Sequence, residues 1–171
     1  MSTPVPERLA NELVSRLETI TVANGYPFNI AGVVRANRDG NTVQYTHQSI
    51  RVDQGNKQRV EQMDCPGNPP ALCWSQPFGI RCFTRNSNKP DDPQDPEAEM
   101  PHVTNTNEMI DAAVQAITAV DSWYTMGDIS FDTRIDAVDG FDADNGEYNG
   151  QMLVVTCLYR VSENDPSEVR G

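Results

Sequence analysis

The sequence has 171 residues, of which 37% are hydrophobic, and its 25 acidic and 13 basic residues give a net charge of −12. This length suits one domain with a sizeable core. The acidic balance argues against a protein that binds nucleic acid or an anionic membrane through a basic surface. No apolar run approaches the roughly 18 residues of a membrane span, and the N-terminal segment lacks a secretion signal, so we expect a soluble protein made in the cytosol.

The first predicted element is a helix from Pro6 to about Val22. Proline is tolerated in a first helical turn, where its missing N–H would have no partner. Gly25 can take the left-handed conformation that closes a helix, and Pro27 prevents its resumption. The apolar residues of this segment recur at helical spacing and share one face: Leu9, Leu13, Leu17 and Ile20.

A sheet is expected to begin directly after this helix. Residues 31–36 form a β-branched strand, and Asp39-Gly40 is typical of a hairpin turn. One or two returning strands follow between residues 42 and 53, with an irregularity at His47-Gln48. The first of two extended loops then covers about residues 55–75, because its prolines exclude a central strand over 55–70.

Residues 76–85 alternate between apolar and other side chains, which predicts a strand with one buried face. The second extended loop, about residues 86–103, is rich in acid and proline and cannot order itself independently. A second helix should begin near Asn105 or Thr106, with Asn105 and Glu108 as a capping box, and end before Gly127. Its apolar face would comprise Met109, Ile110, Ala113, Val114, Ile117 and Val120.

Two further strands complete the prediction, at residues 129–138 and 151–161, joined by a turn-rich acidic connection over 139–150. The last strand is apolar on both faces, which is typical of a central strand covered twice. The helices would cover one face and a neighbouring subunit the other. The whole chain, residues 1–171, is therefore predicted to be one α+β domain, a mostly antiparallel sheet with two helices packed on one face.

No catalytic, cofactor-binding or metal site is predicted. His47 and His102 stand alone outside any motif, and we expect them on the surface or in loops. The best candidate metal cluster fails the EF-hand template and is better explained as a solvated hairpin. It consists of Asp139, Asp142, Asp144 and Glu147. We therefore expect no enzyme activity.

The four cysteines match no zinc or redox spacing. Cys82 and Cys157 lie in apolar strand-like runs and are expected in the core. Cys65 and Cys73 bracket a Pro-Gly-rich loop where a disulfide is possible, although synthesis in the cytosol favours free thiols.

Two segments share a pattern with a known family. The first is TVANGYPFNIAGVVRANRD, residues 21–39, in which a helix ends at an ANGY turn and enters a V-x-R strand. The second is GQMLVVTCLYRVSENDP, residues 150–166, an apolar strand ending in Tyr-Arg and a polar tail with Asp-Pro. Both resemble the tail-terminator and neck proteins of long-tailed bacteriophages, and the predicted element order agrees with that family. The departures are the proline-rich insertion at 65–73 and the acidic loop at 89–101.

The resemblance implies a structural virion protein at the head–tail junction, assembled in the host cytoplasm. Tail terminators form a ring, generally a homohexamer, that caps the tail tube and joins it to the head-side connector. The partners would be identical copies, the tail tube protein and a head-side connector or adaptor, with no cofactor. Interface residues expected within the matching segments are Tyr26, Arg35, Arg38, Tyr159 and Arg160.

The charge gives the acidic loop a possible role within such a ring. Its carboxylates are Asp91, Asp92, Asp95, Glu97 and Glu99. Facing the lumen, they would repel phosphate, so that DNA passes nearby without specific binding. The alternatives are another neck, tail-completion or head-side adaptor protein, or a non-viral soluble module that binds a protein partner against its sheet.

Overall fold

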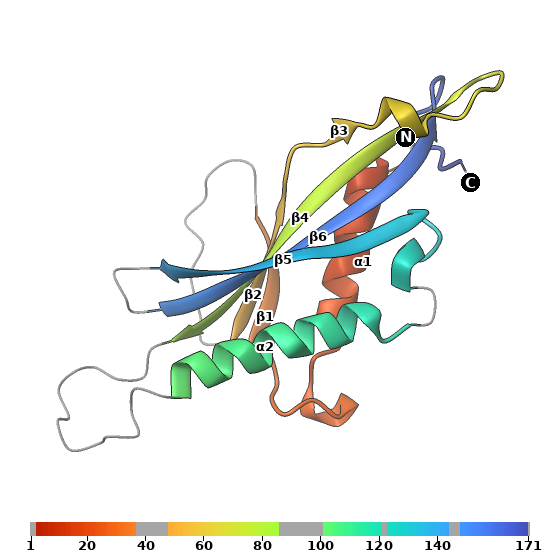
Figure 1. Cartoon of the computed structure of the whole chain (residues 1–171). Helices are drawn as coiled ribbons and strands as arrows, with labels where there is room; N and C mark the ends of the chain where they lie inside the picture. The colour runs from red at the N-terminus through yellow and green to blue at the C-terminus, as the bar shows by residue number, and fades with distance from the viewer. Residues whose placement is uncertain (1–2, 37–47, 86–100, 121–122, 144–147, 171) are drawn as a thin grey trace, which may run out of the picture.

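The computed structural model describes residues 3–36, 48–85, 101–120, 123–143 and 148–170. This part of the chain forms an α+β fold, as the sequence predicts (Figure 1). The predicted order of one helix, several strands, a second helix and two strands is confirmed. The elements are α1 (Val5–Leu17), β1 (Gly32–Arg35), β2 (Ser49–Gln54), β3 (Gln58–Arg59), β4 (Ala71–Arg85), α2 (Pro101–Thr118), β5 (Asp132–Ala143) and β6 (Tyr148–Ser162).

The described strands form one sheet in the order β1-β2-β4-β6-β5, and β3 extends it by pairing with one end of β4. β1 and β2 run parallel, and the other pairs are antiparallel. β6 lies between β4 and β5, which confirms its predicted central position. Both helices pack on one face of the sheet, α1 against β1 and β2, and α2 against β4 and β6 (Figure 1).

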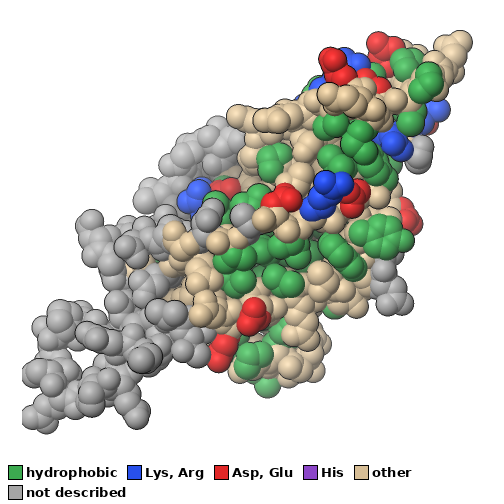
Figure 2. Space-filling model, in the orientation of Figure 1, with side chains coloured by type: hydrophobic (Ala, Val, Ile, Leu, Met, Phe, Trp, Pro, Cys, Tyr) green, Lys and Arg blue, Asp and Glu red, His purple; other side chains and the backbone are tan. Residues whose placement is uncertain are grey.

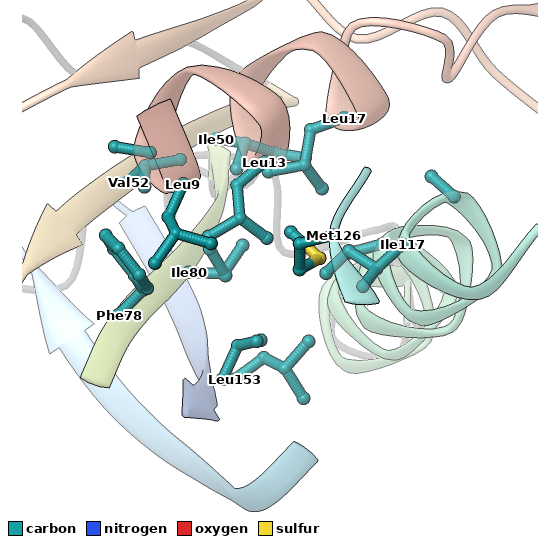
Figure 3. Close-up of a cluster of buried hydrophobic side chains, with 14 of the residues drawn as sticks. Leu9, Leu13, Leu17, Ile50, Val52, Phe78, Ile80, Ile117, Met126 and Leu153 are labelled. Carbon is teal, nitrogen blue, oxygen red and sulfur yellow. The ribbon is translucent and has the colours of Figure 1, made fainter. Parts of the chain in front are cut away.

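The core lies between the helices and this face of the sheet. Leucines of α1 point toward strand residues of the sheet, with Ile117 of α2 and Met126 closing one side (Figure 3). Each large side chain buried here contributes about 1.5–3 kcal/mol to folding. The fully buried residues at this contact include Leu9, Leu13, Leu17, Phe78, Ile80, Ile117, Met126 and Leu153. The predicted apolar faces of both helices are thereby confirmed, although Val120 lies beyond the end of α2 and is half exposed.

Arg16 connects the two helices within this core. Its side chain is only 6% exposed, and its Nη1 donates to the backbone carbonyl of Ile117, 2.8 Å away, in the last turn of α2. Its Nε donates to Glu12 Oε1 at the same distance, one turn earlier in α1. A cation at the C-terminal end of a helix interacts favourably with the carbonyls left unpaired there. Arg16 therefore caps α2 from α1.

The first helix is shorter than predicted, because it ends at Leu17 and not near Val22. The residues after it, from Thr19 to Val22, are all β-branched and disfavour helix, and the Thr19 hydroxyl donates to the carbonyl of Arg16. Gly25 does adopt the left-handed conformation, with φ of 89°, but it closes the short 3-10 helix Val22–Asn24.

β1 and β2 do not form a hairpin with each other. β2 falls within the predicted returning segment, but it runs parallel to β1 and cannot be joined to it by a two-residue turn. The predicted turn at Asp39-Gly40 lies outside the described residues. The predicted irregularity before β2 is confirmed at Gln48, whose φ is 55°.

The predicted end of β4 at Arg85 is confirmed, but its predicted start and the predicted extent of the first loop are wrong. β4 begins at Ala71, five residues before the prediction, and the segment before it contains β3 and the 3-10 helix Glu61–Met63. Cross-strand pairing explains the extension, because Ala71 to Ser75 pair with residues 158–162 of β6. Tertiary pairing overrides the turn signals of the local sequence.

The second helix begins and ends earlier than predicted, and the last two strands are longer than predicted. α2 begins at Pro101, where proline is favoured, so Asn105 lies inside the helix and the capping box is wrong. His102 lies in the first turn of this helix. β5 starts at Asp132 and continues to Ala143, so most of the predicted acidic connection is strand, paired with the first part of β6. A bulge at Asp136 interrupts this pairing.

Candidate interaction surface

The face of the sheet opposite the helices is open in the part of the chain that the structure describes. The register places alternate residues of every long strand on it, including Asp53 on β2, Gly79 on β4 and Val154 on β6. Seen from the side where β5 lies, hydrophobic side chains form surface patches interrupted by charged ones (Figure 2). We call the face of the sheet opposite the helices the open sheet face.

β6 contributes apolar side chains to the open sheet face. Met152 and Val154 are partly exposed, whereas Leu158 further along the same strand is 7% exposed. Met152 lies across Gly79 of β4, where an added Cβ would be 3.2 Å from the methionine sulfur. The glycine therefore lets the Met152 side chain lie flat on the sheet. The predicted two-sided apolar character of β6 is confirmed.

The charged part of the open sheet face consists of arginines held by neighbouring groups. Asp53 accepts a hydrogen bond from Arg51 Nε at 2.7 Å, and its other oxygen lies 2.9 Å from Arg81 Nε, an ion-pair distance without hydrogen-bond geometry. On β6, the guanidinium of Arg160 lies over the ring of Phe131, 4.2 Å from its centroid. Planar guanidinium groups arranged this way can also contact a carboxylate or an aromatic ring of a partner.

A polar cleft with a volume of about 960 Å³ adjoins this face at the N-terminal end of α1. We call it the α1–β2 cleft. It forms where the start of α1, the end of β1, β2, the turn after β2 and the middle of β4 meet. Its lining residues are Pro4, Pro6, Glu7, Arg35, Ala36, Arg51, Asp53, Gln54, Asn56, Lys57 and Gln76.

The floor of the α1–β2 cleft depends on a proline inside β4. Pro77 sits where the neighbouring β2 has ended and β3 has not yet begun, so its missing N–H interrupts no pairing. The N–H of Gly55 donates to the carbonyl of Pro77 at 2.9 Å. The carbonyl of Gly55 accepts instead from the side chain of the fully buried Gln76, at 2.7 Å. Gln76 thus fixes the turn that carries Asn56 and Lys57.

Three cations line the α1–β2 cleft. Arg35 is held by both carboxylate oxygens of Glu7, with Nη2 to Oε2 at 3.0 Å, and by Asn11. The hydrogen bond to Glu7 raises the pKa of Arg35 above its ordinary value, so the guanidinium stays charged. The ammonium of Lys57 lies 4.5 Å from the centroid of the Trp74 ring, and no carboxylate among the described residues forms an ion pair with it.

The residues predicted at interfaces fall into two groups. Arg35 and Arg160 are partly exposed, whereas Tyr26 and Tyr159 are 7% and 1% exposed and pack in the core. Burial raises the pKa of Tyr159 to about 12. The two tyrosines therefore stabilise the fold in this chain, and whether Arg35 or Arg160 contacts a partner stays a prediction. Arg38 lies outside the described residues.

The acidic residues predicted to face a lumen also lie outside the described residues, so that prediction stays open. They are Asp91, Asp92, Asp95, Glu97 and Glu99. Asp144 and Glu147 of the rejected metal cluster lie outside as well. Among the residues that the structure does describe, no group of three or more potential metal ligands occurs, and no helix is long and apolar enough to cross a membrane.

All four cysteines are free thiols in this structure. Cys82 and Cys157 are buried, as predicted, and burial raises the pKa of each to about 12. Cys73 is buried too, which raises the pKa of its thiol, while Cys65 is partly exposed. The Cys73 N–H donates to Asp64 at 2.7 Å and is the main cause of the lowered pKa of that carboxyl.

The sequence did not indicate the α1–β2 cleft. The prolines of residues 55–75 predict an extended loop, and that prediction gives Asn56 and Lys57 no place in a site. One signal was available, because Pro77 lies within a segment predicted as a strand and proline cannot donate to a sheet. It marks the position where the sheet is locally open.

Comparison of the sequence with protein-family models and with curated proteins finds no significant match.

Proposed function

We propose that this protein is a structural subunit of the tail of a long-tailed bacteriophage, a tail terminator that forms a ring on the end of the tail tube and joins it to the head connector. The observation that carries the proposal is the central strand β6, which bears apolar side chains on both faces while the helices cover one face. A sheet face with Met152 and Val154 partly exposed suits contact with another protein surface.

Residues 21–39 and 150–166 resemble tail-terminator and neck proteins. On that basis we propose that the partner of this contact is an identical copy of the chain in a ring. In a closed ring each subunit presents two different patches to its neighbours. The open sheet face is one such patch under this proposal. The net charge of −12 is compatible with DNA passing through the ring without binding, because a lumen lined by basic groups would retain it.

The experiment is the mass of the purified protein in solution, measured by light scattering together with negative-stain imaging. We expect a ring, either free or formed on purified tail tubes. Val154→Glu places a charge on the open sheet face and should abolish ring formation while the subunit stays folded. Gln115→Glu adds the same charge on the exposed face of α2 and serves as the matched control.

Three outcomes separate the proposal from its rivals. A ring lost in V154E but kept in Q115E supports the role of the open sheet face. A ring unaffected by either substitution would refute that role. A monodisperse monomer at high concentration that ignores tail tubes would contradict the terminator function itself and favour a soluble protein-binding module.

The α1–β2 cleft is a specific observation that favours a binding role, either within a neck or tail-completion protein or in a non-viral module. Ligand sites in proteins are concave and commonly span about 300–1,000 Å³. Such a role is compatible with the ring, because the cleft shares Arg51 and Asp53 with the open sheet face but does not include Met152 or Val154.

A further inference from the structure

We infer that the α1–β2 cleft is a binding site for an extended, acidic, proline-containing peptide segment of a partner protein. The cleft lies at the junction of five segments, and its volume of about 960 Å³ accommodates several residues of an extended chain.

The charge of the cleft is opposite in sign to that of the whole chain. Its lining includes three cationic side chains and the two carboxylates Glu7 and Asp53, so it has a net charge of about +1 in a protein of net charge −12. Favourable electrostatics therefore attract an acidic segment to this site and repel it from most of the remaining surface.

The cations are held in fixed positions. Glu7 holds Arg35 through both carboxylate oxygens, and Asp53 holds Arg51 at 2.7 Å. Lys57 stands on the turn that Gln76 fixes through Gly55, and its ammonium lies over Trp74. Because these groups are ordered before a ligand arrives, a carboxylate that contacts them incurs a smaller entropic cost.

The first turn of α1 favours a peptide over a phosphate-bearing ligand in the cleft. A phosphate site at a helix N-terminus needs several free backbone N–H groups. Here Pro4 and Pro6 supply none, and the N–H groups of Glu7 and Arg8 both donate to the carbonyl of Pro4. The prolines and Ala36 instead give the cleft an apolar rim, which suits the side of a proline-containing extended chain.

Lys57 is the residue with which to test the site. Its removal breaks no ion pair among the described residues, so Lys57→Gln should leave folding intact. Arg59→Gln is the matched control. Arg59 lies two residues further on, is 42% exposed, pairs with Asp64 and is not part of the cleft lining.

The probe is a fluorescein-labelled peptide of repeated Glu-Asp-Pro units, followed by fluorescence anisotropy, with a Gln-Asn-Pro peptide as the uncharged control. We expect the wild type and R59Q to bind the acidic peptide with micromolar affinity and K57Q to bind it about fivefold more weakly, as expected for one partly exposed charge pair. Raising the salt concentration from about 50 to about 300 mM should weaken binding further.

Equal binding of the two peptides, or no binding of the acidic one at millimolar concentration, would overturn the inference. So would equal affinities of K57Q and R59Q. A further variant of the full chain neutralises the five carboxylates of residues 91–99 as Asn and Gln. If the acidic peptide binds to that variant alone, the cleft of the wild type is filled by this acidic segment of the chain itself or of a second copy, and the assignment to a different partner is wrong.

Discussion

Substitution of Arg16 by Met tests whether a single buried cation holds the two helices together. The Arg16 side chain is 6% exposed. Methionine keeps most of its aliphatic stem but removes the guanidinium, which donates to the carbonyl of Ile117 at 2.8 Å. A hydrogen bond from a charged donor contributes about 1.5–3 kcal/mol. The variant also leaves Glu12 without this cation, at a small cost because Glu12 is 33% exposed.

We therefore expect R16M to lose about 2–3 kcal/mol of unfolding free energy. For a chain of this length, each kcal/mol lowers Tm by about 2–4 °C, so the melting temperature should fall by about 4–12 °C. The measurement is thermal and urea unfolding followed by circular dichroism, at one protein concentration for all variants.

Two controls separate the contact with α2 from the ion pair within α1. Arg134→Met removes a guanidinium that is 61% exposed and pairs with Asp132, and it should change stability by less than about 0.5 kcal/mol. Glu12→Gln removes the ion pair but keeps the bond to Ile117, and it should cost less than about 1 kcal/mol. If R16M is as stable as R134M, or E12Q is as destabilised as R16M, capping of α2 by Arg16 is not the stabilising contact.

Three further results are expected. Gly55→Ala should lower the free energy of unfolding in urea by about 1–3 kcal/mol, because the new Cβ would lie 2.9 Å from a ring carbon of Pro77. Gly140→Ala has open space around the new Cβ and should cost little. Equal costs of the two substitutions would contradict the packing at the cleft floor. In native protein, Ellman's reagent should modify Cys65 first and the three buried thiols only on unfolding, and four equally fast thiols would refute this burial. Burial raises the pKa of Cys82 and of Tyr159 to about 12, from ordinary values of 9.0 and 10.0. Both groups therefore contribute stability that is complete below about pH 9 and is lost as pH rises toward 12. A Tm that is constant to pH 11 would contradict this pH dependence.

The sequence predicted the fold class because its strongest signals are properties of whole segments. Leucines at helical spacing and the long apolar run of β6 each identify an element and its buried face, and both faces were correct. Boundaries were less accurate. The ends of β4, β5 and β6 are set by pairing with one another. The local sequence at the start of β4, rich in Gly and Pro, carries no trace of its partner in β6, where Ala71 pairs with Ser162, 91 residues later.

Strand direction and the α1–β2 cleft could not be predicted for a related reason. An Asp-Gly pair favours a tight turn, but the residues between β1 and β2 do not determine whether β2 pairs parallel or antiparallel with β1, its direct neighbour in the sheet. The cleft brings together residues from 4 to 76, and no single stretch of sequence contains its charges. Tyr26 and Tyr159 illustrate the same limit, since their motifs suggest a surface role and their burial shows a structural one.

Decoration of purified phage tail tubes tests the proposed function most directly. Tail tubes that lack their terminator are mixed with the protein and imaged by negative stain and cryo-electron microscopy. A ring of identical copies seated on one end of each tube, absent when V154E is used and present with Q115E, is the result that the proposal predicts. Bare tube ends at saturating protein, with the chain remaining a monomer, would contradict it.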